Sequence, residues 1–280
     1  MRDWNSVRLP KPFTLAVACA VLVLTAVGCG RSAPWPPTPG SAPQSPTDAS
    51  DNGYREPPQV RRAVRGPGGS VVLLSGQALP GAIVRLASPS GQHQEVQADA
   101  SGVWSLTAPP GGPALYGVSQ EADGRRDQAQ GYLAILPTGE PAAAVLRSGD
   151  GAVVLAPSNG KLMIMAVDFD GTGAAVVSGR AGANEPLKVL VDGTAAVDGA
   201  AGADGRFFLS LPKPLAPGLR VLQVRGPSGG GEVSVDIGPT PPFAGVLRAS
   251  RREAGWRLDW TTPTGGVQTT ELFALQEPAH

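Results

Sequence analysis

Beyond residue 70 the sequence alternates short apolar runs with turn-forming residues. Each run holds four to six residues and is bounded by Gly, Pro, Asn or Asp. Runs of this length separated by turn residues are typical of the strands of β-sandwiches. The predicted strands cover residues 71–74, 82–87, 103–107, 132–136, 152–155, 162–167, 187–191 and 207–211.

Two stretches of this region repeat the same pattern of a Ser-Gly start, an aliphatic strand, a turn glycine and an aromatic residue. The corresponding residues are Gly76 and Gly179, Gly102 and Gly205, and Trp104 and Phe207, at equal spacing in both stretches. The second glycine of each stretch supplies a turn, and the aromatic ring that follows is expected to fill a core. The repeat predicts two tandem modules of one architecture.

The C-terminal part predicts a three-stranded meander over residues 243–250, 256–262 and 267–275. Trp256, Leu258 and Trp260 alternate with Arg257 and Asp259, so the three large apolar side chains share one face. Two interpretations stay open. This face packs on the preceding module, or it forms an exposed aromatic strip that binds a glycan or a protein.

The N-terminus has the pattern of an export signal. Arg2, Arg8 and Lys11 precede an apolar stretch over residues 13–27. Fifteen residues are fewer than the ~20 that span a bilayer as a helix. A basic start, a short apolar core and small residues at its end are typical of a secretory signal peptide.

The end of this stretch, Ala26-Val27-Gly28-Cys29, resembles a bacterial lipobox. The resemblance implies cleavage before Cys29 and acylation of that cysteine, and Gly30 in place of Asp implies the outer membrane. Release after ordinary signal cleavage and an uncleaved anchor are the alternatives. Residues 29–69 follow as a Pro-, Ser- and Gly-rich segment without apolar periodicity, which predicts a disordered tether.

The first repeat resembles the bacterial immunoglobulin-like modules of envelope and surface proteins. The residues that carry this resemblance are Gly76, Ala78, Pro80, Gly81, Ala82, Val84, Leu86, Ala98, Asp99, Gly102, Trp104 and Leu106. The second repeat is similar to the Ig-like segment of proteobacterial envelope proteins that also carry a LysM module. This chain has no LysM-like segment, so a direct wall-binding role does not transfer.

The sequence offers little for chemistry. The 23 basic and 23 acidic residues balance, so nothing favours nucleic acid as a partner. Cys19 and Cys29 precede the folded part, and His93 and His280 have no companions at metal-ligand spacing. Residues 168–171 begin like a calcium loop but lack its closing glutamate, and a strand end running into a turn is preferred. We expect no catalytic residue, no metal, no cofactor and no small-molecule substrate.

These observations predict an all-β protein, with two Ig-like β-sandwich modules and a C-terminal meander behind a signal peptide and a linker. The expected parts are residues 1–28 (signal peptide), 29–69 (anchor cysteine and tether), 70–138 (module 1), 139–160 (connecting β-hairpin), 161–238 (module 2) and 239–280 (meander). The expected role is a non-catalytic envelope lipoprotein held in the membrane through Cys29, with a structural, adhesive or protein-binding function. The alternative is a carbohydrate- or peptidoglycan-binding protein that uses Trp256 and Trp260.

Overall fold

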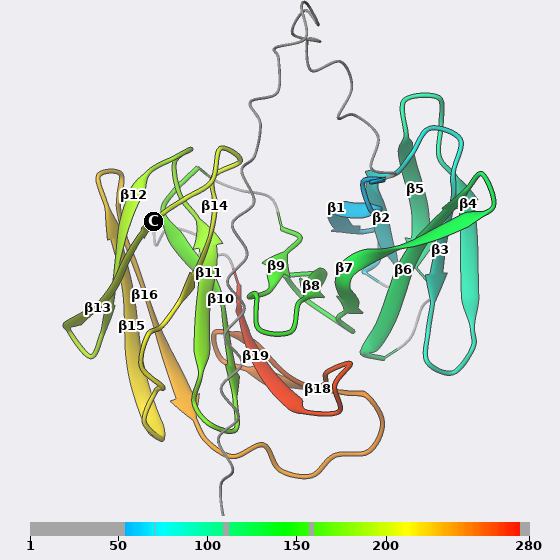
Figure 1. The fold of residues 1–280 in the computed structure, drawn as a ribbon. Coiled ribbons are helices and arrows are strands. Elements are labelled where there is room, and N and C mark those ends of the chain that lie inside the picture. The colour runs from blue at the N-terminus through cyan, green and yellow to red at the C-terminus, as the bar shows by residue number, and fades with distance from the viewer. Residues whose placement is uncertain (1–53, 70, 109–111, 157–159, 275–280) are drawn as a thin grey trace, which may run out of the picture. The chain divides into compact units, whose positions relative to one another are not determined.

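The computed structural model describes residues 54–69, 71–108, 112–156 and 160–274. The signal peptide, Cys29 and most of the predicted tether lie outside this part of the chain. All the described residues belong to one compact unit, residues 53–280. They contain nineteen strands and no helix, and the paired strands are antiparallel (Figure 1). The predicted all-β class is confirmed.

The first sandwich pairs a three-stranded sheet with a six-stranded sheet. The strand orders are β1-β2-β5 and β4-β3-β6-β7-β8-β9. Its strands are β1 (Gln59–Arg65), β2 (Val72–Gln77), β3 (Ile83–Ala87), β4 (His93–Gln97), β5 (Val103–Ala108), β6 (Ala114–Ala122), β7 (Arg125–Ile135), β8 (Ala143–Leu146) and β9 (Val153–Val154). Val84 and Leu86 alternate inward along β3 and are buried with Trp104 and Leu133 in one core, as period-two patterning requires.

The second sandwich pairs a four-stranded sheet, β13-β12-β15-β16, with a six-stranded sheet, β14-β11-β10-β19-β18-β17. Its strands are β10 (Met163–Asp170), β11 (Ala175–Arg180), β12 (Pro186–Val191), β13 (Thr194–Ala200), β14 (Arg206–Ser210), β15 (Gly218–Gly226), β16 (Gly229–Ile237), β17 (Leu247–Arg252), β18 (Gly255–Thr261) and β19 (Val267–Phe273). Phe169, Val189, Phe207 and Leu222 are buried in its core. The last three strands form the predicted meander, which extends this sheet because β19 pairs with β10.

The sequence repeat corresponds to a repeated piece of structure. Gly76 lies opposite Trp104 on paired strands, and Gly179 lies opposite Phe207 in the same way. The backbone N–H of Ala78 donates to the carbonyl of Gly102, and an equivalent bond from Ala181 ends on the carbonyl of Gly205, at 2.8 Å in both cases. Both turn glycines have positive φ, 80° at Gly102 and 74° at Gly205, where side chains are disfavoured.

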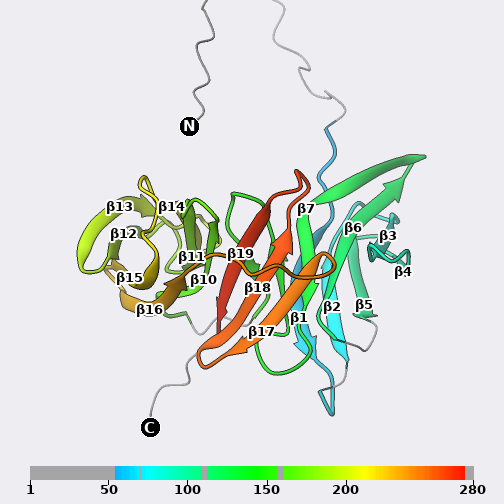
Figure 2. The same cartoon turned by 90° about the horizontal axis from the view of Figure 1, so that it is seen from below.

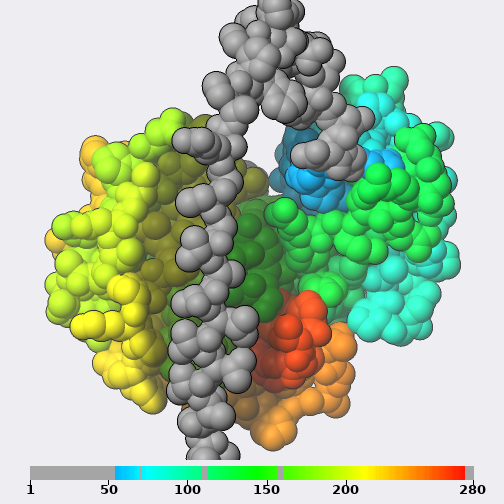
Figure 3. Space-filling view, in the orientation of Figure 1, coloured from blue at the N-terminus to red at the C-terminus, as the bar shows by residue number. Residues whose placement is uncertain are grey.

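A third apolar core joins the two sandwiches. It contains Ala134 and Leu136 from the β7 region, Leu146 from β8, and Trp260 from β18. Leu115, Ala144, Ala152, Val154, Met165, Ala166, Trp256, Leu258 and Leu272 complete this junction core. Figure 2 shows β18 and β19 beside the β7 strand, and in Figure 3 their red surface adjoins the green surface of the first sandwich. The two six-stranded sheets are therefore covered on both faces. One face packs in the core of its own sandwich, and the other packs in the junction core.

The structure differs from the expected boundaries in two places. β1, at Gln59–Arg65, falls inside the range predicted as tether, although it pairs with β2 along its length. In the range expected as a connecting hairpin, β8 pairs with β9 and also with β7, so these strands extend the first sandwich.

Candidate functional site at the bulge of β7

The local geometry of the site begins with an irregularity in β7. Gly117 pairs with Tyr132 and Ser119 pairs with Gln128, so three residues of β7 oppose the single residue Val118 of β6. Gly131 within this bulge has a φ of 104°, and a β-carbon there would lie 2.4 Å from the carbonyl oxygen of Leu146. Bulges bend a strand, leave backbone groups unpaired and occur often beside functional sites.

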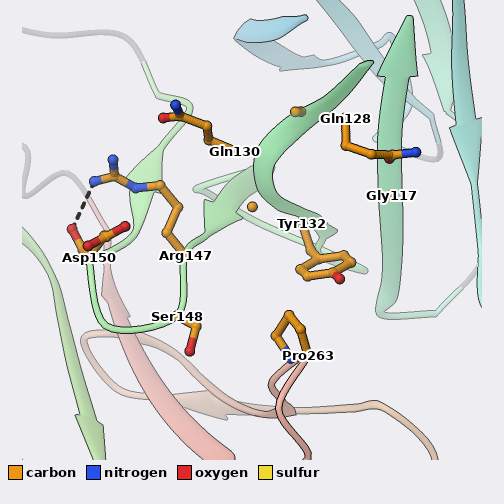
Figure 4. Close-up of a pocket in the computed structure, with 10 residues that line it drawn as sticks. Gly117, Gln128, Gln130, Tyr132, Arg147, Ser148, Asp150 and Pro263 are labelled. Atoms are coloured by element: carbon orange, nitrogen blue, oxygen red, sulfur yellow. Dashed lines mark hydrogen bonds between the residues drawn. The ribbon is translucent and has the colours of Figure 1, made fainter. Parts of the chain in front are cut away.

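Two adjacent cavities lie against the bulge. They share Ala129, Gln130, Gly131 and Arg147. The first, of about 480 Å³, is also lined by Tyr132, Ser148, Asp150 and Pro263 (Figure 4). The second, of about 310 Å³, is also lined by Tyr54, Glu56 and Arg206 and by a set of apolar side chains. We call the two together the bulge cleft. Its walls come from both sandwiches, because Arg206 lies on β14 and Pro263 follows β18.

Arg147 is the charged side chain common to both cavities, and its position is fixed from several sides. Its Nε donates to the carbonyl of Gly151 at 2.8 Å, and its Nη2 donates to the carbonyl of Asp150 at 2.9 Å. Its guanidinium carbon lies 4.1 Å from the centre of the Phe208 ring, a cation–π contact. Burial lowers the pKa of Arg147; the charges of Asp150 and Asp168 oppose this shift, and the nearby charge of Arg206 adds to it.

The loop that carries Arg147 and Ser148 is held by buried polar groups of the second sandwich. The carboxylate of Asp168 accepts hydrogen bonds from the backbone N–H of Ala152 at 2.7 Å and from the Thr270 hydroxyl at 2.5 Å. Gln268 donates to Asp168 at 3.1 Å and accepts from the N–H of Gly149 at 3.1 Å. Burial raises the pKa of Asp168 to about 6, partly offset by these hydrogen bonds. The contacts fix one wall of the bulge cleft.

A second buried polar group lies in the meander and has a structural role. Asp259 accepts hydrogen bonds from Arg248, Arg257 and Thr269. Burial alone would raise the pKa of Asp259. These hydrogen bonds and the positive charges of Arg248 and Arg257 nevertheless hold that pKa below its usual value. Burial raises the pKa of the neighbouring Glu271 to about 7. The donors Arg248, Arg257 and Thr269 compensate the buried charge of Asp259, and a buried ion needs such partners.

The sequence-predicted site residues take different places. Cys29 lies outside the described residues, as does His280. Trp256 and Trp260 are 5% and 0% exposed, and both belong to the junction core. Their face packs, as one of the two interpretations expected, but against strands of the first sandwich as well as against β10. Neither side chain forms an exposed strip.

Residues 168–171, which begin like a calcium loop, form the end of a strand and the start of a turn. β10 ends at Asp170, whose carboxylate accepts hydrogen bonds from the backbone N–H groups of Thr172 and Ala174. This is the strand end and turn that the sequence favoured. Within residues 54–69, 71–108, 112–156 and 160–274 there is no group of three or more His, Cys, Asp or Glu that could hold a metal ion. The same residues include no helix able to cross a membrane.

Sequence reasoning did not find the bulge cleft. Its polar residues, Gln128, Gln130, Arg147 and Asp150, are scattered among turns and strands and follow no motif. The one available signal is the mostly polar stretch 127–130, which Gly131 separates from the apolar run that begins at Tyr132. Such a break can mark an irregular strand, but it does not indicate which distant residues face it.

No protein-family model matches the chain, and no curated protein matches it. Several solved structures are similar to it at low identity, including the following three. The first is the BSP domain of a biofilm associated protein (12% identity, 66% of this chain, 30% of that chain, TM-score 0.23). The second is the central fibronectin-III array of RIM-binding protein (15% identity, 75% of each chain, TM-score 0.26). The third is from a 1.5-MDa bacterial ice-binding adhesin (11% identity, 78% of this chain, 88% of that chain, TM-score 0.21). The chain spans 30% of the first structure's length, and likenesses at these TM-scores decide nothing about function.

Proposed function

We propose that this chain is a non-catalytic lipoprotein of the bacterial cell envelope. An acylated Cys29 holds it in the membrane, and its two joined β-sandwiches present a binding surface to an envelope protein. The outer membrane is the proposed location, following the resemblance of residues 26–30 to a lipobox. The segment between Cys29 and Tyr54 then serves as the spacer between the lipid and the sandwiches.

The observation that carries the proposal is the junction core. Modules that act only as spacers need no buried contact with one another, whereas this core buries two tryptophans, Trp256 and Trp260, between the sandwiches. A cleft whose walls come from both sandwiches keeps its shape only if the sandwiches are fixed. The bulge cleft is such a surface, and its exposed Gln128 and Gln130 stand at its edge.

Binding of a glycan through Trp256 and Trp260 finds no support. A sugar ring stacks on an accessible aromatic face, and these two indoles are buried in the junction core. The proposed partner surface is therefore the bulge cleft.

The anchor is tested by replacing Cys29 with serine in the full-length protein. The proposal predicts that wild type takes up a labelled fatty acid and sediments with membranes, and that Cys29→Ser does neither. A substituted protein that is processed and fractionates as wild type does would show that Cys29 is not the anchor.

The binding surface is tested by a photo-crosslinking amino acid placed at Gln130 in living cells. Lys188, exposed on β12 away from the cleft residues, is the matched control. A discrete crosslinked product from position 130 and none from position 188 is expected. Equal products from both positions, or none from either, would contradict the proposed surface.

A further inference from the structure

We infer that the second cavity of the bulge cleft binds the carboxyl terminus of a partner polypeptide, with an aliphatic last residue on its floor and the terminal carboxylate between Arg147 and Arg206. The inference rests on the proposed function and names the chemistry of the partner. It is argued from the floor of the cavity, from its charges and from the bulge residues that lie outside the β6–β7 register.

The floor of this cavity is apolar. It is formed by Val60, Val118, Leu133, Val145 and Val153. Val118 and Leu133 also belong to the core of the first sandwich, so the cavity opens directly onto that core. Its volume of about 310 Å³ is at the small end of the ~300–1,000 Å³ of ligand sites. A cavity of this size and lining suits one aliphatic side chain with its backbone.

Two arginines, Arg147 and Arg206, also line this cavity. The hydrogen bonds of Arg147 use its Nε and Nη2, and no bond among the described residues uses its Nη1. The Nε of Arg206 is buried and has no partner within the same part of the chain, while its Nη1 contacts Asp204 at 3.2 Å. A carboxylate placed between these two cavity-lining guanidinium groups would be held by charge-assisted hydrogen bonds and would relieve the repulsion between their like charges.

One acidic side chain also lines the cavity. Glu56 accepts a hydrogen bond from the amide of Gln59 at 2.5 Å. With Arg147 and Arg206 the lining residues still carry a net positive charge. Asp204 contacts Arg206 but is 58% exposed, and surface ion pairs of this kind contribute little. A buried carboxylate ligand would therefore compete effectively for Arg206.

The arrangement of floor and charges selects a chain end over an internal acidic residue. In a C-terminal residue the carboxylate is attached to the α-carbon, so the side chain can reach the floor while the charge stays at the arginines. An internal Asp or Glu carries its charge at the tip of the side chain, which would place it on the valines at a high desolvation cost. Backbone groups of residues 129–131, outside the β6–β7 register, can bond the main chain of the bound peptide.

The test measures fluorescence anisotropy of labelled eight-residue peptides with the purified full-length protein in detergent. Three peptides of one sequence are used. The first ends in valine as a free acid, the second ends in valine as an amide, and the third has an internal aspartate with an amidated end. The free acid is expected to bind at least about tenfold more tightly than either of the others, because charge-assisted bonds to two arginines are lost. Equal binding by acid and amide, or no binding by any, would overturn the inference.

Arg206→Gln is expected to remove this preference for the acid, and Arg225→Gln, an exposed arginine on β15, is expected to keep it. Melting temperatures close to wild type confirm that both variants fold. A preference that survives Arg206→Gln, or that Arg225→Gln also removes, would count against the assigned site. If crosslinks from position 130 persist while no peptide end binds, the inference fails and the proposed function stands. Loss of the crosslinks themselves would remove the proposed function as well.

Discussion

The ring of Tyr132 on β7 packs against the indole of Trp260 on β18, with centroids 6.3 Å apart and ring planes inclined by 56°. The two residues belong to different sandwiches, and Trp260 is fully buried between them. Tyr132 also lines the first cavity of the bulge cleft. One aromatic contact therefore links the packing of the junction core to the shape of the candidate site.

Trp260→Ala is expected to lower the free energy of unfolding by about 3–5 kcal/mol, as truncation of a buried aromatic side chain usually does. Urea unfolding followed by circular dichroism measures the loss without depending on tryptophan fluorescence. Leu219→Ala is the control, because Leu219 is 68% exposed and its truncation should change stability by less than ~0.5 kcal/mol. Similar small effects of both substitutions would contradict the burial of Trp260.

The raised pKa of Asp168 predicts that the free energy of unfolding decreases as the pH rises. Burial raises its folded pKa to about 6 from an ordinary value of 3.8, so the folded protein keeps a proton that the unfolded chain releases. Stability from this group is complete below about pH 4, decreases as the pH rises to about 6, and is constant above that. Two pKa units set an upper limit of about 3 kcal/mol. Unfolding experiments from pH 4 to 7 should show a flatter profile for Asp168→Asn than for wild type.

Asp170→Asn is the matched control for this profile. The pKa of Asp170 is lowered, since hydrogen bonds from Thr172 and Ala174 outweigh its partial burial. Its contribution to stability therefore changes below pH 4, and the slope between pH 4 and 6 should stay as in wild type. A profile that Asp168→Asn leaves unchanged would mean that this carboxylate titrates normally.

The paired glycines of the repeat predict equivalent sensitivity in the two sandwiches. A β-carbon on Gly76 would lie 1.9 Å from the Gln59 carbonyl oxygen and 2.6 Å from the Trp104 ring. One on Gly179 would lie 2.0 Å from the Met163 carbonyl oxygen and 2.7 Å from the Phe207 ring. Ala at either position should destabilise the protein by about 1–3 kcal/mol or more through overpacking. Gly171→Ala, where a β-carbon meets no atom within 4 Å, should be nearly neutral. Thermal melting of the three variants checks this, and tolerance of Ala at only one repeat position would argue against structural equivalence.

The repeat is the part of the fold that sequence reasoning predicted best. Glycine spacing, alternating Val84 and Leu86, and the aromatic pair Trp104 and Phe207 are local signals, and each indicates its own strand or turn. β1 was missed because its sequence, QVRRAVR, is rich in arginine and only Val60 and Ala63 are buried. An edge strand needs few apolar residues, so its composition resembles that of a linker.

The partners of Trp256 and Trp260 were beyond sequence reasoning for a different reason. Strand alternation shows that both side chains share a face, but it does not show which sheet covers that face. The covering residues, such as Leu146 and Ala134, come from the first sandwich, more than 100 residues earlier in the chain. The bulge cleft depends on the same long-range packing, because Arg147 and Arg206 meet only after both sandwiches have formed.

The claim that the two sandwiches act as one unit is tested most directly by differential scanning calorimetry of the protein from residue 54 onward. The junction core predicts a single transition with equal calorimetric and van't Hoff enthalpies. Ala144→Asp, which places a charge in that core, should split the transition in two. Two independent transitions in the wild-type protein would contradict the account.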